Sequence, residues 1–185
     1  MLYVKVHLFR NTALQILLHS KKFIKSFLSV FDINDSITTR IYEIMIAFYD
    51  STDYSSCDPT GFLNAFEFYH KKFKGFKQHD SQEFLRILLE DLSKELNTVI
   101  ILPKYRELET TNKNKKELNL NFHKMFIDRE NSIIVDLFYS QICNTFTCSK
   151  CYNQKFSFEK IVDIPLLIGI KGLKKKMNFI VIYMI

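Results

Sequence analysis

The sequence predicts an α+β fold, in which a helical part is followed by a partial antiparallel β part. Through the first hundred residues, apolar side chains recur with the spacing of amphipathic helices. Beyond residue 131 they alternate with polar side chains in two short runs, which is typical of paired strands. The chain has 4 Gly and 3 Pro in 185 residues, and this composition favours a globular, helix-rich protein over a disordered one.

Caps and apolar spacing divide the helical part, residues 8–97, into successive helices. Segments 11–18 and 21–28 have the pattern of two short helices, and Asp35 or Ser36 can cap a third. The apolar stripe of the third helix consists of Ile37, Ile41, Ile44, Met45 and Phe48.

A loop and a proline mark the start of the fourth helix. The stretch STDYSSCDPTG has the composition of a loop. Pro59 suits a first helical turn, so a fourth helix is expected to run from there to about Lys72. The stretch FKGFK then links this helix to the next.

The stretch QHDSQEFLRILLEDL predicts an amphipathic helix with a polar start. Asp80 can act as the N-cap, and Glu83 can reach back to the backbone N–H of the cap residue. The apolar stripe that follows consists of Phe84, Leu85, Leu88, Leu89, Leu92 and Leu96. Capping does not require Gln78 and His79, so it stays open whether this polar start also handles a substrate.

The second half of the chain changes character. Residues 98–130, which include LETTNKNKKELNLN, are predicted to form a polar loop or insertion. Within residues 131–167, NSIIVDLFYSQICNTFTC begins as a short helix or turn and continues as a strand. QKFSFEKIVDIPL is a second strand, joined to the first across SKCYN as a hairpin. Residues 168–185 form a divergent tail.

The charge and hydropathy of the sequence argue against a nucleic-acid or membrane partner. The net charge of +6 comes from lysines that are mostly spread among acidic residues, without an arginine-rich stripe, so no nucleic-acid partner is expected. The N-terminal segment has no basic leader followed by an apolar run, and MNFIVIYMI is too short to cross a bilayer. We therefore expect no membrane partner and a cytoplasmic or nuclear location.

Two cysteines at the hairpin tip form a CxxC motif. A tight turn can direct the thiolates of Cys148 and Cys151 at one tetrahedral ion, so half of a zinc site is the favoured interpretation. Two idle thiols remain an alternative. A redox pair is less favoured, because a hairpin does not offer the helix start that lowers a thiol pKa.

The remaining cysteines and the histidines carry weaker signals. Cys143 lies on the other face of its strand from Cys148, which predicts a packing role. Cys57 lies in a loop with nothing nearby to activate it as a nucleophile. The five histidines have no spacing typical of a metal site or a catalytic triad.

Two separated motifs resemble the ubiquitin-specific protease family of cysteine deubiquitinases. They are QHDSQEFLRILLEDLSKELN and NSIIVDLFYSQICNTFTCSKCYNQKFSFEKIVDIPL, and NTALQILLHSKKFIKSFL is similar to the family segment that follows the nucleophile. The resemblance implies an incomplete papain-like cysteine peptidase fold. Residues 8–97 would form a helical thumb, and a partial fingers region carrying the CxxC would end near Leu167.

The resemblance also gives the polar helix start a role. In the family these residues line the channel that receives the C-terminal tail of ubiquitin, so Gln78 and Asp80 are candidates for hydrogen bonding an extended peptide. Glu83 and Phe84 are expected to fix and pack the helix. The alternative that Asp80 is only a helix cap stays open.

The same resemblance implies that the reaction centre is missing. The family's G-N-T-C box should immediately precede NTALQ, but Leu8 occupies the position of the nucleophile and KVH replaces G-N-T. The family's late His box is also not recognisable, so no catalytic residue can be named. The family mechanism is thiol attack on the isopeptide carbonyl after the C-terminal glycine of ubiquitin, through an acyl-enzyme that water hydrolyses.

These observations lead to one expectation and two alternatives. We expect a member of the deubiquitinase family, with ubiquitin or ubiquitinated proteins as partners, that does not cleave ubiquitin conjugates by itself. Divergence on both sides of the motifs fits a truncated gene product better than a pseudoenzyme. The alternatives are a non-catalytic ubiquitin-binding or scaffold protein, and a small helical nucleic-acid binder that depends on the +6 charge.

Overall fold

The chain divides into two compact units. A computed structural model describes residues 8–30, 36–50, 58–75, 77–104, 106–108 and 114–164. Residues 1–97 and 132–137 group into a helical unit, and residues 98–131 and 138–185 group into a hairpin unit. Asp35, Cys57, residues 165–167 and the tail 168–185 carried sequence predictions but lie outside the described residues.

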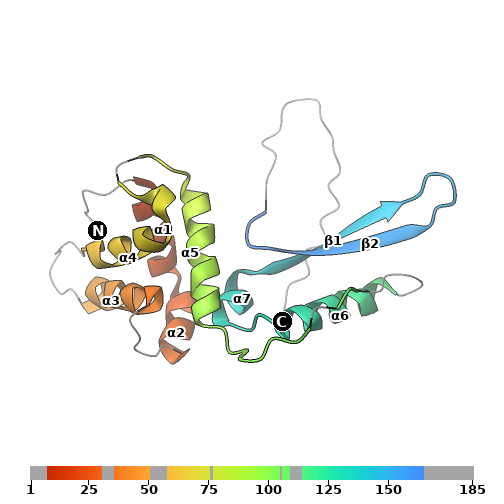
Figure 1. Cartoon of the computed structure of the whole chain (residues 1–185), viewed down its shortest axis with the longest axis horizontal. Helices are drawn as coiled ribbons and strands as arrows, with labels where there is room; N and C mark the ends of the chain where they lie inside the picture. Colours follow the sequence, from red (N-terminus) through yellow and green to blue (C-terminus); the bar gives the residue numbers. More distant parts are fainter. Residues whose placement is uncertain are drawn as a thin grey trace. The chain divides into compact units, whose positions relative to one another are not determined.

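Successive amphipathic segments make up the helical unit. Its elements are α1 (Leu8–His19), α2 (Lys21–Val30), α3 (Ile37–Asp50), α4 (Thr60–Tyr69), the short 3-10 helix η1 (Lys71–Phe73), α5 (Ser81–Glu95) and α7 (Ile133–Phe138). Helix α5 packs against α1, and α3 lies next to α4 (Figure 1). The predicted helices are confirmed, except that α4 ends at Tyr69 and η1 covers the last residues expected to belong to it.

A cluster of aromatic rings forms the core of this unit around Phe84. The Phe84 side chain is fully buried, and its ring centroid lies 4.7 Å from that of Phe66. Other ring centroids around Phe84 are those of Phe73 at 5.5 Å, Phe9 at 5.6 Å and Phe62 at 6.5 Å. Tilted and edge-to-face arrangements of this kind add to the stabilisation that burial provides. The start of α5 is therefore attached to the densest part of the core.

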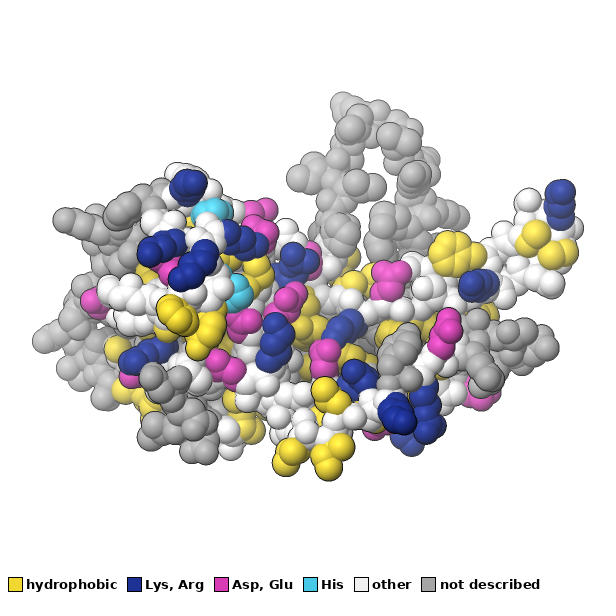
Figure 2. Space-filling view, viewed as in Figure 1, with side chains coloured by type: hydrophobic (Ala, Val, Ile, Leu, Met, Phe, Trp, Pro, Cys, Tyr) yellow, Lys and Arg dark blue, Asp and Glu magenta, His cyan; other side chains and the backbone are white. Residues whose placement is uncertain are grey.

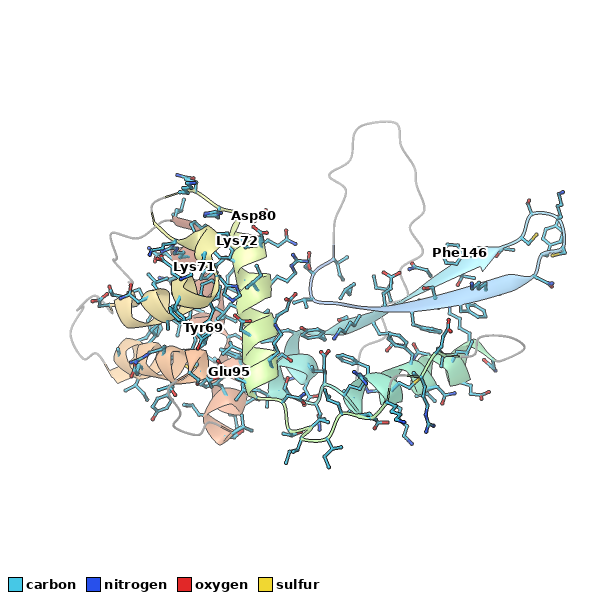
Figure 3. All side chains as sticks on the ribbon, in the orientation of Figure 1. Tyr69, Lys71, Lys72, Asp80, Glu95 and Phe146 are labelled. Atoms are coloured by element: carbon cyan, nitrogen blue, oxygen red, sulfur yellow. The ribbon has the colours of Figure 1, made fainter. Side chains whose placement is uncertain are left out.

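Hydrogen bonds join the C-terminal end of α5 to the start of α3. At that end of α5, the Glu95 carboxylate accepts hydrogen bonds from the backbone N–H groups of Ile37, at 3.2 Å, and Thr38, at 2.8 Å. The Thr38 hydroxyl also donates to Glu95. This carboxylate therefore caps the N-terminus of α3, where a helix leaves N–H groups without partners. Figure 3 shows Glu95 and Asp80 at opposite ends of α5.

The hairpin unit is built from one helix and two strands. Strand β1 (Ser140–Thr147) pairs antiparallel with β2 (Gln154–Ile161), from Ser140 opposite Ile161 to Thr147 opposite Gln154. Helix α6 (Lys115–Ile127) contributes the fully buried Leu118 to a small core with Cys143 and Phe158. The α+β class and the packing role of Cys143 are thereby confirmed.

Helix α6 corrects the prediction of a polar loop over residues 98–130. Asn114 caps the helix by accepting a hydrogen bond from the Lys116 N–H at 2.9 Å. Leu118 and Phe122, one helical turn apart, then pack against the hairpin. In the sequence this apolar pair is outweighed by the polar and charged residues around it, which predict a loop.

Helix α7 joins the helical unit although its sequence neighbours form the hairpin. The predicted short helix before the first strand is confirmed. The buried hydroxyls of Ser132 and Ser93 lie 2.9 Å apart, which attaches the start of α7 to α5. Residues 131–167, predicted as one part, are therefore divided between the two units. Among the described helices, none combines the length and the apolar character that crossing a membrane requires.

Candidate functional site

The polar start of α5 is the candidate site, and Asp80 is its best-defined residue. The Oδ1 atom of Asp80 accepts a hydrogen bond from the Gln82 N–H at 2.8 Å, so the predicted N-cap is confirmed. The Asp80 side chain is exposed, and no described residue donates to Oδ2. Gln78 is exposed as well. One carboxylate oxygen and one side-chain amide are thus available to an external ligand at this helix start.

His79, between these two residues, is directed toward the core instead of the solvent. Its ring makes edge-to-face contacts with Phe73 and Phe9, with centroid separations of 5.0 Å and 5.5 Å. The Nε2 atom is buried, and no described group is hydrogen bonded to it. The residues on either side of His79 are therefore held at the surface by a ring that is packed beneath them.

Arg10 anchors the segment that leads into this helix start. The Arg10 side chain is buried, and its Nη2 donates to the carbonyl oxygen of Phe73 and, at 3.4 Å, to that of Gly75. Its Nη1 lies 2.7 Å from Oε1 of Glu67. Gly75 has a φ of 85°, in the left-handed region that residues with a Cβ avoid. One guanidinium group and one glycine together fix the turn before Gln78.

Glu83 has a different partner from the one predicted. Its carboxylate Oε1 accepts a hydrogen bond from Nζ of Lys72 at 2.8 Å, so the side chain binds η1 rather than the backbone of the cap. This hydrogen bond lowers the pKa of Glu83, and the positive charges of Lys72 and Arg86 act in the same direction. Lys72 thus joins Glu83 to η1, while the next side chain, Phe84, is buried in the core.

Leu8, at the position predicted for a nucleophile, is the first residue of α1. Its side chain is 81% exposed. The next residue, Phe9, contacts both His79 and Phe84, so α1 begins beside the polar start of α5. An alkyl side chain offers neither a lone pair nor a transferable proton, which means that this position can contribute contact area but no nucleophilic chemistry.

The tip of the hairpin holds the two thiols of the CxxC motif. Cys148 and Cys151 are exposed, and the turn between the strands is closed by a 2.9 Å hydrogen bond from the Cys148 N–H to the Asn153 carbonyl. Backbone N–H groups of Cys151 and Lys150, followed by the Cys151 side chain, hydrogen bond to the Cys148 sulfur and lower its pKa. The turn amides therefore lower the pKa of Cys148 although the hairpin contains no helix start.

These thiols meet half of the requirement for a structural zinc ion. N–H groups directed at a sulfur favour the thiolate that zinc needs, and both thiols lie on one tight turn. Among the described residues, however, no group of three or more His, Cys, Asp or Glu side chains is arranged to hold a metal. Two further ligands would have to come from outside the described part of the chain.

The roles of two residues at the α5 site, Arg10 and His79, were not predicted from the sequence. Arg10 lies on the apolar stripe of α1, beside Ala13, Leu14 and Leu17, and a charge in such a stripe is a signal for a buried ion pair. No residue near His79 in the sequence indicates that its ring packs against Phe9, which lies on α1. The structure brings Gln78, Asp80, Glu83 and Phe84 together, as expected for one helix start, and Cys148 and Cys151 together in the other unit.

Comparison with known proteins gives consistent matches. A family model described as "Ubiquitin carboxyl-terminal hydrolase" matches residues 5–178. Ubiquitin carboxyl-terminal hydrolase 9 of Arabidopsis thaliana is 33% identical over 173 residues, which cover 85% of this chain and 19% of that protein. Ubiquitin carboxyl-terminal hydrolase 2 of Gallus gallus is 28% identical over 137 residues, or 74% of this chain and 38% of that protein. This chain thus spans well under half of either relative.

A solved structure agrees in fold. A chain in the "Structure of the Ubp8-Sgf11-Sgf73-Sus1 SAGA DUB module" superimposes with a TM-score of 0.54 at 18% sequence identity. The match covers 88% of this chain and 34% of that chain. The similarity supports an incomplete papain-like α+β fold.

Proposed function

This chain belongs to the ubiquitin carboxyl-terminal hydrolase family, and from that membership we propose that it binds the C-terminal tail of ubiquitin through the polar start of α5. We propose in addition that the chain does not cleave ubiquitin conjugates by itself. The observation that carries the first proposal is the Asp80 cap, whose second carboxylate oxygen is exposed beside Gln78.

The chemistry of an extended peptide suits this site. A threaded tail presents backbone N–H and C=O groups, which pair with a carboxylate acceptor and a side-chain amide respectively. The packed rings of His79, Phe9 and Phe73 keep the helix start in one position. A site held rigid before binding loses less conformational entropy when the ligand arrives.

The absence of cleavage rests on Leu8. Acyl transfer in this family uses a thiolate, and a leucine at that position cannot form the acyl-enzyme bond. With the chain as it stands, we expect no release of fluorophore from ubiquitin aminomethylcoumarin. Turnover that is removed by a thiol-blocking reagent would overturn this part of the proposal, since it would show that another cysteine acts as the nucleophile.

Three variants separate ubiquitin binding from helix capping. Asp80→Asn keeps the capping oxygen but replaces the second acceptor with a donor, so we expect unchanged folding and about tenfold weaker ubiquitin binding. Asp80→Ala should lose both the cap and the binding. Asn114→Ala removes the equivalent cap of α6 and is the matched control, which should lose stability without weaker binding. Calorimetric titration with ubiquitin measures the affinities, and thermal unfolding measures the stabilities.

Two outcomes would contradict the role of the polar start. If Asp80→Asn and Gln78→Ala bind ubiquitin as tightly as the unmodified chain, these side chains do not contact the tail. If the unmodified chain shows no saturable binding, the chain is not a ubiquitin receptor in this form.

We further propose that Cys148 and Cys151 provide two ligands of a structural zinc site. When bound, zinc would hold the hairpin tip closed through its two thiolates. A titration with cobalt(II) is expected to give thiolate charge-transfer absorption that Cys148→Ser abolishes and Cys143→Ser, a buried cysteine in the same hairpin, leaves intact. Absorption that survives Cys148→Ser, or no absorption at all, would contradict the zinc proposal.

A further inference from the structure

A basic and aromatic surface lies on the helical unit between α4 and the candidate site. We call it the 68–77 patch, and it consists of Phe68, Tyr69, Lys71, Lys74 and Lys77. Phe68 and Tyr69 are each 66% exposed at the end of α4, and the three lysines are exposed. Figure 2 shows Lys and Arg side chains gathered on this face of the unit beside hydrophobic ones, and Figure 3 locates Tyr69 and Lys71 there.

The charges of this patch are not neutralised within the described protein. Lys72, in the same stretch, is paired with Glu83, and the nearby Glu67 is paired with Arg10. No described carboxylate forms an ion pair with Lys71, Lys74 or Lys77. The Lys71 ammonium instead lies 4.9 Å from the centroid of the Phe68 ring. The patch therefore presents a local excess of positive charge to solvent.

A hollow adjoins the aromatic end of the patch. It has a volume of about 430 Å³, and Phe68 and Tyr69 form part of its wall. Residues of α3, including Ile37 and Arg40, and residues of α4, including Gly61 and Asn64, form the rest. Apolar wall area and a few polar groups are combined here as in sites that accept a side chain.

We propose that the 68–77 patch and its hollow bind an acidic segment of a partner protein that carries an apolar anchor. The anchor side chain would enter the hollow between α3 and α4, where Phe68 and Tyr69 meet it. Asp or Glu residues beside the anchor would then lie over Lys71, Lys74 and Lys77. This surface uses neither Gln78 nor Asp80, so it is independent of the ubiquitin site proposed above.

The geometry favours a peptide over other anionic partners. Phe68 and Tyr69 are perpendicular, with centroids 5.2 Å apart, and Lys71 covers Phe68, so the rings do not form parallel platforms for successive nucleic-acid bases. A hollow beside the charges suits an inserted side chain, whereas a bilayer surface needs no concavity. The lysines do not present the rigid, planar fork with which arginine recognises phosphate.

The test measures fluorescence anisotropy with the full chain and a fluorescein-labelled peptide of alternating Asp and Glu around a central Leu-Leu pair. We expect saturable binding that weakens as salt is added. Replacing Leu-Leu by Ser-Ser in the peptide should weaken binding about tenfold, because the anchor loses its burial. Replacing Asp and Glu by Asn and Gln should abolish binding at moderate salt.

Matched variants of the chain separate the patch from net charge. The triple variant Lys71→Glu, Lys74→Glu, Lys77→Glu is expected to weaken peptide binding at least about tenfold. The control triple variant Lys104→Glu, Lys116→Glu, Lys124→Glu makes the same change in net charge at exposed lysines of the hairpin unit and should leave binding almost unchanged. Circular dichroism checks that both variants fold.

A further variant tests the hollow without removing a charge. A Cβ added at Gly61 would meet nothing within 4 Å, so Gly61→Phe can place a ring in the hollow without a backbone clash. We expect this variant to bind the Leu-Leu peptide about tenfold more weakly and the Ser-Ser peptide as before. Gly61→Ala, which fills little of the hollow, is its control and should bind like the unmodified chain.

Several outcomes would overturn the proposal. Equal affinity for the Leu-Leu and Ser-Ser peptides would show that no anchor enters the hollow. If both triple variants weaken peptide binding equally, the peptide responds to the net charge of the chain and not to the patch. If an oligo-dT strand or phosphatidylserine vesicles bind to the patch and the peptide does not, the surface serves another class of partner. If no probe binds, the surface does not have the proposed role.

Discussion

The two units of this chain hold their elements together in different ways. In the helical unit, Phe84 contacts rings from several other segments and is fully buried. In the hairpin unit, a core of Leu118, Cys143 and Phe158 joins one helix to a two-stranded sheet, while Phe146 near the tip is 60% exposed. A lone hairpin is marginally stable, so its order depends on the helix packed against it. The α5 site is therefore rigid by virtue of its core, and the thiols are held mainly by their local turn.

The largest effect is expected from Phe84→Ala, which removes the centre of the aromatic cluster. It should lower the free energy of unfolding by about 3–5 kcal/mol, because both burial and ring contacts are lost. Urea unfolding followed by circular dichroism measures this change. Phe146→Ala removes the same side chain from an exposed strand position, and a loss there as large as at Phe84 would contradict the contrast between the units.

The next effect concerns the buried charge at the base of the site. Arg10→Gln should lower the free energy of unfolding by about 3 kcal/mol, since Glu67 and the carbonyls of Phe73 and Gly75 lose their charged donor. Arg40→Gln is the control, because its pair with Glu43 is solvent-exposed and such pairs contribute at most about 1 kcal/mol. If the two variants are equally stable, Arg10 does not anchor the turn.

A smaller and more local effect is expected in the hairpin unit. Leu118→Ala should cost about 2–3 kcal/mol within that unit, because the fully buried leucine joins α6 to the strands. Hydrogen exchange should accelerate at the amides of β1 and β2 while α5 keeps its protection. Leu120→Ala, at a residue of the same helix that is 66% exposed, is the control. Acceleration in α5 to the same degree would show that the two units unfold together.

The cap that Glu95 provides to α3 predicts a modest effect. Glu95→Ala should lower the free energy of unfolding by about 1–2 kcal/mol, because the N–H groups of Ile37 and Thr38 lose their acceptor. Glu90→Ala removes a carboxylate from the same helix without removing a cap, so thermal unfolding should distinguish the two. Indistinguishable melting temperatures would contradict the capping role.

The smallest effect depends on pH. The pKa of Glu83 lies below its ordinary value of 4.5 because Lys72 hydrogen bonds to the carboxylate, so ionised Glu83 stabilises the fold above that pH. The contribution disappears as the pH falls through the lowered pKa. Carboxyl NMR titration should therefore show a pKa below 4.5 that rises in Lys72→Gln, whereas Lys94→Gln, which removes a lysine elsewhere, should leave it unchanged. A Glu83 pKa that Lys72→Gln does not move would contradict the pairing.

Local features of the site were predictable and long-range ones were not. The Asp80 cap and the apolar stripe of α5 follow from residues a few positions apart, and both are present. Glu83 was predicted to bind the backbone N–H of the cap residue, but it binds Lys72 instead. A capping box involves only residues within one helical turn, and Lys72 lies on another element. The lowered pKa of Cys148 was missed for a related reason, since it depends on the direction of turn amides that the motif does not specify.

The sequence by itself determined the α+β class, the approximate position of most helices and of both strands, and the Asp80 cap. Those properties depend on spacing and side-chain type, which can be read within a few residues. Tertiary structure decided that Arg10 holds Phe73, that Glu95 caps α3, and that a polar segment becomes α6. Such contacts join residues far apart in the chain, and their energies depend on which surfaces meet when the elements pack.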